Sequence, residues 1–239
     1  MKILDLTFPT PEENLACDEA LLEACEAGSS GKILRFWESS RIFAVVGYSN
    51  RVADEIQTEA CQKDKVTILR RVSGGGTVLQ GSGCLNYSLL LPIKNEDFGN
   101  TISDANHFIM NRQAEALSRL LRQEVHVQGD TDLAIGSLKF SGNAQRRKNQ
   151  YLLFHGTFLL NFDLSLIERY LKMPPKQPAY REGRPHGEFV MNLNVPASSV
   201  KEALVSAWKA EGALKEAPKD KIQSLVQNIY SKPEWNYKF

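Results

Sequence analysis

The stretch "LRRVSGGGTVLQGSGCLNYSLLLP", from Leu69 to Pro92, decides the middle of the fold. Two arginines, Arg70 and Arg71, end an apolar run and come just before three consecutive glycines. A second apolar run follows and stops at Pro92. Adjacent residues of a strand point to opposite faces, so one arginine can face a site while the other faces solvent or a neighbouring element.

The glycines between these runs predict either a ligand loop or a plain turn between strands. Three glycines in a row cost backbone entropy, and they let a ligand approach the main chain closely. Their N–H groups can form a nest that suits an anion, and a guanidinium beside it suits a phosphate or carboxylate. The loop lacks GxxxxGK[ST] and GxGxxG, so it is neither a P-loop nor a dinucleotide fingerprint.

The rest of the chain mixes short apolar strands with helices of regular spacing. Thr10-Pro11-Glu12-Glu13 predicts a capped helix start, with the helix ending near Gly28. Gly136-Ser137 reads as the two-residue turn of a hairpin. Further strands are expected at 32–38, 42–48, 66–72, 85–92 and 151–162, and helices at 103–123, 164–171, 198–211 and 219–232. This predicts an α+β chain of one domain over residues 1–239, with a mixed sheet and a helical C-terminal extension at 195–239.

Composition narrows the classes of function. The chain has 239 residues, 42% hydrophobic and 24% charged, with a net charge of +1, which argues against a nucleic-acid binder that depends on bulk positive charge. No apolar run approaches the ~18 residues of a membrane span, and no signal peptide is recognisable. The cysteines form no CxxC pair or disulfide framework, which favours a reducing cytoplasm. The four histidines show no metal spacing, so we expect no intrinsic metal or prosthetic group.

Three residues beyond the glycine loop are candidates for chemistry. Lys139 lies on the second strand of the predicted hairpin; strand lysines usually face solvent, but the small polar run "SGNAQ" after it indicates a backbone that lines a pocket. A fixed lysine near a phosphate can neutralise charge that develops during phosphoryl or acyl transfer. His155 is either a satisfied core residue or a pocket residue. Asp132 is either a turn residue or a ligand for magnesium that arrives with a nucleotide.

Three motifs in this order resemble the lipoate–protein ligase A / octanoyltransferase / biotin ligase superfamily, and most closely its lipoate–protein ligase branch. They are "RRVSGGGTV" (70–78), "DLAIGSLKFSGNAQ" (132–145) and "HGTFLLN" (155–161), and the resemblance extends over about residues 1–194. It implies a mostly antiparallel mixed sheet flanked by helices, as in the class II aminoacyl-tRNA synthetase and biotin ligase catalytic domains. The implied reaction forms lipoyl-adenylate from lipoate and ATP, with Mg²⁺, and then passes the acyl group to a lysine of an acceptor domain.

The resemblance also implies roles for individual residues. Lys139 would be the essential catalytic lysine, acting by charge stabilisation and positioning. Asp132 would help to hold Mg²⁺. The nucleotide and acyl-phosphate would be held by Arg70, Arg71, Ser73, Gly74, Gly75, Gly76, Thr77, Val78, Leu79, Asp132 and Lys139. The acyl pocket would be lined by Gly47, Asn86, Tyr87, Ser141, Gly142, Asn143, Ala144, His155, Gly156 and Thr157.

Two alternatives to an ATP-dependent cytoplasmic ligase stay open at this point. An octanoyl- or lipoyl-transferase would work through a cysteine thioester, and the half of the chain where relatives carry that cysteine has none after Cys84. The other alternative is a non-catalytic module that binds lipoate and carries out neither adenylation nor acyl transfer. For a ligase, the expected acceptor is a lipoyl domain or a glycine-cleavage H-type carrier protein. Since no accessory domain is expected after residue 194, either the chain catalyses both steps alone or it needs a separate accessory subunit for adenylation. No nucleic-acid or membrane partner is expected. Gln80-Gly81 departs from the commonest family pattern after the glycines.

Overall fold

The computed structural model describes residues 1–94, 98–99 and 101–239. Its strands are β1 (Lys2–Asp5), β2 (Ile33–Trp37), β3 (Phe43–Val46), β4 (Thr67–Arg70), β5 (Val78–Gln80), β6 (Cys84–Pro92), β7 (His126–Gln128), β8 (Asp132–Ile135), β9 (Leu138–Arg147) and β10 (Tyr151–Leu159). Its helices are α1 (Pro11–Glu26), α2 (Val52–Glu55), α3 (Thr58–Lys63), α4 (Ile102–Leu121), α5 (Ser165–Tyr170), α6 (His186–Phe189), α7 (Ala197–Ala207), α8 (Lys219–Leu225) and α9 (Pro233–Asn236). A 3-10 turn (Ala179–Arg181) and a π-helical turn (Val226–Tyr230) complete the described elements. None of the helices in the described ranges combines the length and the apolar character that a membrane crossing needs.

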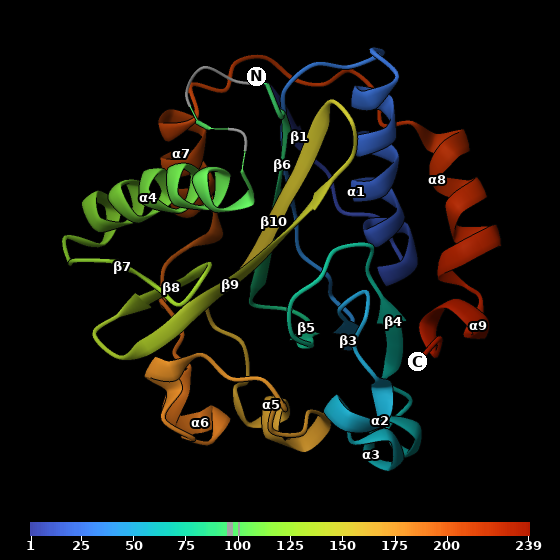
Figure 1. The fold of residues 1–239 in the computed structure, drawn as a ribbon, viewed down its shortest axis with the longest axis vertical. Helices are drawn as coiled ribbons and strands as arrows, with labels where there is room; N and C mark the ends of the chain where they lie inside the picture. Colours follow the sequence, from blue (N-terminus) through green and yellow to red (C-terminus); the bar gives the residue numbers. More distant parts are fainter. Residues whose placement is uncertain (95–97, 100) are drawn as a thin grey trace.

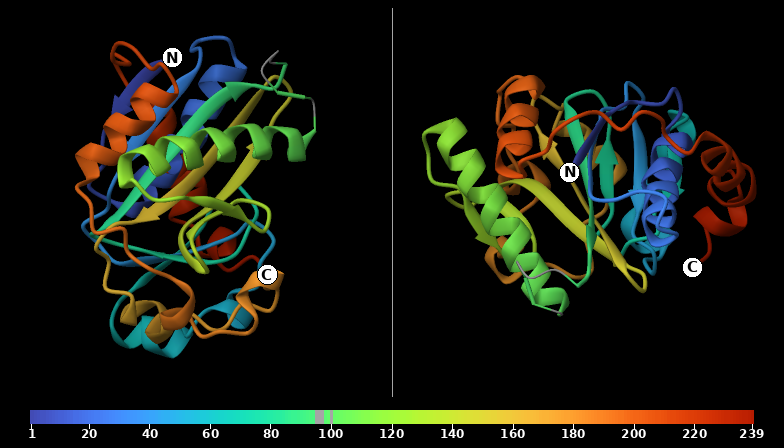
Figure 2. Two further views of the ribbon diagram at one scale, coloured as in Figure 1. Left: turned by 90° about the vertical axis from the view of Figure 1, so that its left-hand side faces the viewer. Right: turned by 90° about the horizontal axis from the view of Figure 1, so that it is seen from above.

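A large sheet divides the molecule into two layers of helices (Figure 1). Helices α4 and α7 cover one face, while α1 covers the other with α8 outside it, as the view from above in Figure 2 also shows. The strand order is β1-β2-β6-β10-β9-β8-β7, and only the pair β1–β2 is parallel. The expected mostly antiparallel mixed sheet is therefore confirmed.

A second, smaller sheet was not expected. Its order is β4-β3-β5, with β3 parallel to β4 and antiparallel to β5. The glycine loop connects β4 to β5. The loop is thus held at both ends by the small sheet, while the large sheet supplies the surface beneath it.

The helix starts show which sequence signals were sufficient. Thr10 caps α1 in a capping box with Glu13, and Pro11 occupies the first turn, as predicted. The long helix α4 begins earlier than predicted, because Thr101 is its cap and Asp104 is the third residue that closes the box. The hairpin turn at Gly136-Ser137 is confirmed, since Ile135 pairs with Leu138.

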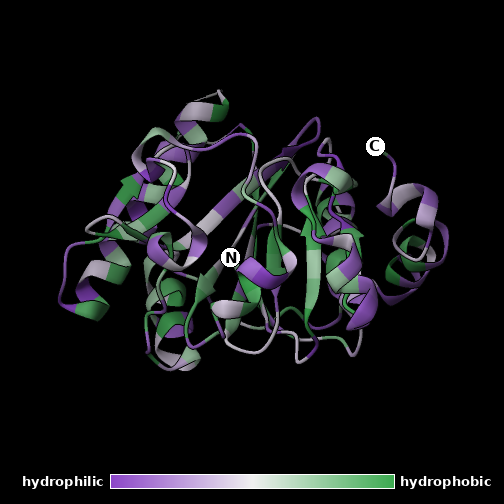
Figure 3. Cartoon of the chain, turned by 90° about the horizontal axis from the view of Figure 1, so that it is seen from below, coloured by the Kyte–Doolittle hydropathy of each residue, from purple (hydrophilic) through white to green (hydrophobic). Residues whose placement is uncertain are grey.

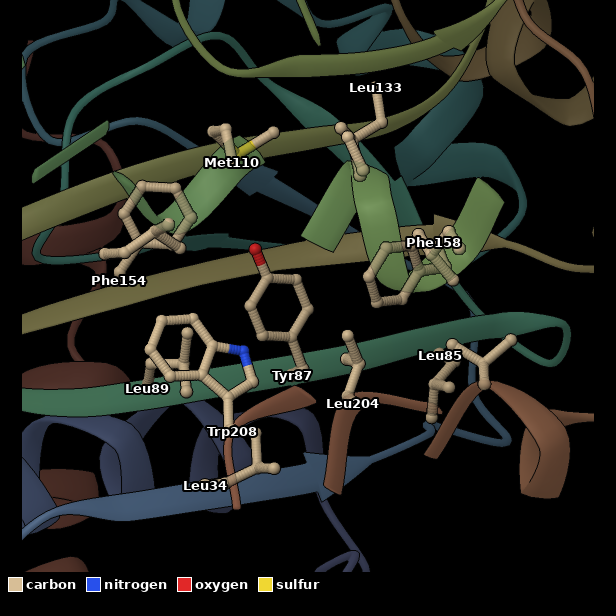
Figure 4. Packing of buried hydrophobic residues seen from close by; sticks show 14 of the residues in the cluster. Leu34, Leu85, Tyr87, Leu89, Met110, Leu133, Phe154, Phe158, Leu204 and Trp208 are labelled. Atoms are coloured by element: carbon tan, nitrogen blue, oxygen red, sulfur yellow. The ribbon is translucent and has the colours of Figure 1, made fainter. Parts of the chain in front are cut away.

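Apolar side chains fill both faces of the large sheet. Figure 3 shows the hydrophobic colours concentrated on the inner strands and the hydrophilic ones on the periphery. One core lies between the sheet and α4/α7, and Figure 4 shows Tyr87, Phe158, Leu204 and Trp208 packed together in it. Another lies between the opposite face and α1, with Trp37 and Leu153 from the sheet. The candidate site borders this second core.

The segment after residue 195 packs on the body of the domain at two places. Helix α7 packs against α4, while α8 and the π-helical turn pack against α1. At its end, the carbonyl groups of Trp235 and Asn236 accept hydrogen bonds from the Arg70 guanidinium, at 3.0 and 3.2 Å. The Trp235 indole N–H returns a 2.9 Å bond to the Arg70 carbonyl oxygen.

Arg70 is a structural anchor. Its remaining guanidinium N–H groups donate to the carbonyl oxygens of Gly47, Tyr48 and Asn50, at 2.8 to 3.1 Å. The side chain is fully buried. The sequence left open whether the arginine that does not face the site points to solvent or to a neighbouring element. Arg70 points to a neighbouring element. Arg70, expected to hold the nucleotide, points away from the glycine loop.

Arg70→Lys is expected to lower the free energy of unfolding by about 2 kcal/mol or more. A lysine keeps the charge but cannot reach carbonyl groups from two sides with a planar fork, so buried acceptors lose their donors. Urea unfolding measures the effect. The control is Arg119→Lys on the exposed side of α4, which should change stability by less than about 0.5 kcal/mol. Equal stability of the two variants would contradict the anchor.

Candidate functional site

The glycine loop is shaped from behind by Arg71. Its Nη2 donates to the carbonyl oxygens of Gly74 and Gly76 at 2.6 and 2.8 Å, and its Nη1 donates to Val45 at 3.2 Å. Burial lowers the pKa of Arg71 to about 10, which still leaves it charged at neutral pH. The guanidinium therefore holds the carbonyl groups inward and places a positive charge directly behind the loop.

The outer side of the same loop presents free main-chain donors. Gly74, Gly75 and Gly76 are exposed, and their amide N–H groups donate to no acceptor in the described part of the chain. The next amide, that of Thr77, donates to Glu55 at 2.9 Å. Exposed amides over a buried guanidinium have the geometry expected of an anion nest, and binding of an anion there stays a prediction.

Two glycine positions fix the seat of the loop. Gly75 adopts a φ of +87°, and a Cβ there would lie 3.0 Å from the Arg71 guanidinium and 3.5 Å from the Ala144 methyl group. A Cβ on Gly47 would lie 2.1 Å from the Gly75 carbonyl oxygen. The loop therefore lies between the turn at Gly47 and strand β9, a fit that larger residues would prevent.

A bulge in β9 aims Lys139 at this loop. Leu133 pairs with Ser141 but Ala134 pairs with Lys139, so one extra residue interrupts the ladder at Phe140. The shift leaves Phe140 in the core under α4 and moves Lys139 to the face of Gly142, where a Cβ would lie 2.9 Å from the Lys139 Nζ. Without the bulge, Lys139 would share the face of Ser141 and point toward α4.

Lys139 is held by an acidic partner. Its Nζ lies 2.8 Å from Oδ1 of Asp132, and the lysine side chain is 26% exposed. The other carboxylate oxygen of Asp132 accepts a 2.8 Å hydrogen bond from the Tyr180 hydroxyl. Tyr180 belongs to the segment 173–190, whose end is fixed by a 2.9 Å bond from the Met191 N–H to the Lys139 carbonyl oxygen. This long segment, which contains several prolines, therefore packs beside the lysine.

Paired strands continue the site across the large sheet. In register, Thr157 lies between Gly142 and Asn86, and His155 lies between Ala144 and Ser88. Gln80, Thr157 and Asn86 form a closed ring of hydrogen bonds. Gln80 Nε2 donates to Thr157 Oγ1 at 2.7 Å, Thr157 Oγ1 donates to Asn86 Oδ1 at 2.7 Å, and Asn86 Nδ2 donates to Gln80 Oε1 at 3.0 Å. Gln80, where the sequence departs from the commonest family pattern, is thus part of a satisfied buried network.

The structure brings together most of the predicted site residues and separates a few. Those around one surface are Gly47, Arg71, Ser73, Gly74, Gly75, Gly76, Asn86, Asp132, Lys139, Gly142, Ala144, His155 and Thr157. Thr77, Val78 and Leu79 lead from the loop into β5. Tyr87, Ser141 and Asn143 point to the opposite face, where the Tyr87 hydroxyl donates to Asn143 and its ring packs in the core of Figure 4. Gly156 lies in that row without a side chain. These four residues do not line the surface that carries Lys139.

Sequence reasoning missed two buried charges near the site. Asp18 on α1 lies 2.5 Å from the Arg35 guanidinium, and its other oxygen faces His155. Burial raises the pKa of Asp18, but the Arg35 charge and the His155 contact together outweigh it and lower the pKa overall. An acid on the apolar face of a helix and an arginine inside "ILRFW" were visible signals for this pair.

None of the four cysteines offers a reactive thiol. All are free and buried. Burial raises the pKa of Cys17, Cys25 and Cys84 to about 12, and raises that of Cys61 as well. Cys84 in particular is fully buried and faces the Leu79 carbonyl oxygen. A cysteine that carries an acyl group must be deprotonated and must be accessible to the substrate, and none of these four cysteines meets either requirement.

Alkylation measures this directly. At pH 8 the native protein should take up no iodoacetamide during the time in which the denatured chain labels all four thiols, because the folded state keeps them protonated and out of contact with water. Intact mass gives the count. Rapid labelling of Cys84 in the native state would contradict the description above.

Comparison with known proteins gives the same family as the motifs. Residues 10–209 match the model of the lipoyl protein ligase A/B catalytic domain. A "Probable lipoate-protein ligase A" of Mycoplasma pneumoniae is 28% identical over 99% of this chain and 72% of its own length. The "Lipoate-protein ligase A subunit 1" of Thermoplasma acidophilum is 25% identical over 93% of this chain and 90% of its own. An octanoyltransferase LipM of Oceanobacillus iheyensis is 28% identical over 77% and 74%.

Solved structures confirm the fold class. A lipoate-protein ligase A bound with ATP superposes with a TM-score of 0.84 at 23% identity, over 99% of this chain and 98% of the other. A bipartite ligase of T. acidophilum, described with its E2 lipoyl domain, gives 0.82 at 23% identity, over 99% and 95%. A biotin protein ligase of Aquifex aeolicus gives 0.50 at 12% identity, over 95% and 72%. These identities are low, so the superpositions are evidence of architecture alone.

Proposed function

The chain belongs to the lipoyl protein ligase A/B catalytic-domain family, and we propose that it is an ATP-dependent lipoate–protein ligase. It would join lipoate, or octanoate, to ATP and transfer the acyl group from the acyl-adenylate to a lysine of a lipoyl domain or H-type carrier protein. The single observation that carries this proposal is the placement of Lys139 and the glycine loop over neighbouring small residues of β9.

The two groups are suited to the charges of such a reaction. Lys139 extends over Gly142, and the loop rests against Ala144, two residues further along the same strand. Two residues of a strand span about 6.6 Å, a separation that one phosphoryl group with its ester oxygen can bridge. Negative charge that develops on phosphate or acyl oxygens would meet an ammonium group on one side and amide donors on the other.

Lys139 would act through charge and position. Its ion pair with Asp132 keeps the ammonium at the rim in the absence of substrate. A substrate oxygen can then take over part of that contact without a new search of side-chain conformations, which is the entropic gain of a preorganised site. In the second step the attacking amine belongs to the acceptor protein, so Lys139 needs no covalent role.

Magnesium fits this site only as part of the substrate. No cluster of three acidic, histidine or cysteine side chains occurs within residues 1–94, 98–99 and 101–239. Asp132 has one oxygen on Lys139 and the other on the Tyr180 hydroxyl. We therefore propose that Mg²⁺ enters with the phosphates of ATP and that Asp132 supplies at most one of its oxygen ligands.

Lipoate-dependent exchange of pyrophosphate into ATP tests the proposal. Lys139→Ala should lower the exchange rate about a hundredfold or more, since it removes a charge that faces the reacting phosphate. Lys148→Ala, on the turn after the same strand, removes only a surface pair with Glu23 and should leave exchange unchanged. Exchange that persists in Lys139→Ala would exclude the assigned role of the lysine.

Failure of the wild-type chain has two readings that assays can separate. The T. acidophilum relative is bipartite, so exchange should be measured alone and with an accessory subunit of that kind. Absence of exchange in both cases would exclude a ligase. Lipoate binding without turnover, unaffected by Lys139→Ala, would instead support the binding module.

The ligase and the transferase predict opposite effects of removing the Cys84 thiol. If the chain is a ligase, Cys84→Ser should transfer an acyl group to the acceptor as well as the wild type does, because the thiol is fully buried and its pKa is raised to about 12. A transferase that works through Cys84 would lose transfer in this variant. Intact mass of the acceptor measures transfer. An octanoyl thioester on Cys84 formed without ATP would overturn the ligase in favour of the LipM-type reaction.

A further inference from the structure

A continuous row of polar side chains connects the glycine loop to the helix layer above the sheet. Arg71 Nε donates to Ser73 Oγ at 3.1 Å, and Ser73 Oγ lies 2.5 Å from Nε2 of His155. On the far side of the ring, His155 Nδ1 lies 3.4 Å from Asp18 Oδ2. Arg35 Nη1 donates to the other oxygen of Asp18 at 2.5 Å. Five side chains from four separate segments thus form one hydrogen-bonded series.

Nearly all of this series lies out of contact with water. Arg35 and Ser73 are fully buried, and Asp18 is 3% exposed. The His155 side chain is 13% exposed. Groups buried in this way keep their hydrogen-bond directions, because no solvent competes for them.

The chemistry of the end groups fixes the direction of each bond. Arginine can only donate, so Ser73 Oγ accepts from Arg71. Asp18 accepts at both oxygens, so His155 carries its proton on Nδ1. The Ser73 hydroxyl proton has no other acceptor among the described residues, so it goes to Nε2, which must then carry no proton. A single neutral tautomer of His155 satisfies every member.

The arrangement has the residue types of a hydrolytic triad, but its serine is not a nucleophile. The Ser73 side chain has no exposed surface, so no acyl carbon can reach its oxygen in this conformation. The hydroxyl proton points to His155, and one lone pair of the oxygen is used by Arg71. What the series can do is hold the first residue of the loop at a fixed orientation.

We propose that Asp18 is a positioning residue, which holds the Nδ1–H tautomer of His155 and through Ser73 fixes the conformation of the glycine loop. Only its catalytic consequence rests on the proposed ligase function. Ser73 immediately precedes the exposed amides of Gly74, Gly75 and Gly76, so a change in its hydrogen bonds rotates the peptide groups that would meet the anionic part of the substrate. Arg35 in turn keeps Asp18 oriented.

Asp18→Asn gives a sharp test, because it exchanges one atom. The remaining amide oxygen must face Arg35, which only donates, so the new NH₂ group faces His155 and donates to Nδ1. The ring proton is then expected on Nε2, which deprives the Ser73 hydroxyl of its acceptor. ¹⁵N chemical shifts of the His155 ring, assigned with His155→Gln, should report Nδ1–H in the ligand-free wild type and Nε2–H in Asp18→Asn.

A matched control and a second variant separate this role from a general loss of structure. Glu19→Gln, on the next residue of α1, exchanges a carboxylate that accepts from Tyr230 and should leave both the tautomer and the loop unchanged. Ser73→Ala keeps Asp18 and the buried charges but breaks the same connection. It should shift the amide signals of Gly74, Gly75 and Gly76 as Asp18→Asn does.

The expected kinetic effect of Asp18→Asn is a fall in kcat/KM for exchange of about ten- to a hundredfold, the range found when supporting groups behind a site are changed. An Nε2–H tautomer in the wild type, glycine amide signals that do not move in either variant, or unchanged kcat/KM in Asp18→Asn would each overturn the proposal. The spectroscopic readouts need no turnover. A wild type without exchange, both alone and with an accessory subunit, would therefore count against the ligase, while the tautomer and the glycine signals still decide the role of Asp18.

Discussion

The buried guanidinium of Arg71 is the contact on which the geometry of the site depends. A charge without a carboxylate partner is costly to bury, and the cost is offset here by carbonyl oxygens drawn from the loop and from β3. These carbonyl groups would otherwise point outward and repel an anion. The Gly74 carbonyl shares its peptide plane with the Gly75 N–H, so the bond to Arg71 turns this amide outward, while the Gly75 carbonyl, bonded to Asn50, does the same for the Gly76 N–H. The bonds that stabilise the buried charge therefore also help to orient the exposed amides of the loop.

Arg70 extends this effect to the other side of β4. Its guanidinium binds three carbonyl groups of the 47–50 turn and two near the end of the chain. The turn at Gly47 is also the surface against which Gly75 rests. Neighbouring arginines thus fix the loop and its seat by the same kind of bond, from opposite faces of one strand. The alternation of side chains along β4 makes this division of roles possible.

Local signals in the sequence predicted a large part of this architecture, and long-range pairing explains most of what they missed. The capping box of α1, the hairpin turn at Gly136-Ser137 and the opposite orientations of the two arginines depend on residues close in sequence. The second sheet depends on pairing between β3 and β4, which lie twenty residues or more apart and form strands of only four residues each. No periodic pattern indicates which short apolar run will pair with which.

The site shows the same limit in a sharper form. Motif order identified Lys139, but its orientation depends on a bulge at Phe140 that no residue preference announces. Strict alternation would place Lys139 with Ser141 and Asn143, whereas the shifted register places it with Gly142 and Ala144. This change of face explains why Lys139 lies with Gly142 and Ala144 while Ser141 and Asn143 point to the opposite face. Tyr87 left the predicted pocket for a simpler reason, since it follows Asn86 on the regularly paired strand β6 and so faces the other way.

The polar series from Arg35 to Ser73 also bears on how an apolar acyl chain and a phosphate could share one site. The core under α1 supplies aliphatic and aromatic surface, with Trp37 and Leu153 on the same sheet face as Arg35 and His155. Charged groups in such a place are tolerated because each is paired, and the series passes from the helix to the loop without an exposed member except part of the His155 ring. An apolar wall can then lie directly beside the loop without leaving an unpaired polar group against it. Under the proposed function, the loop would position the anionic end of the substrate, and apolar side chains of other elements would contact its hydrocarbon part.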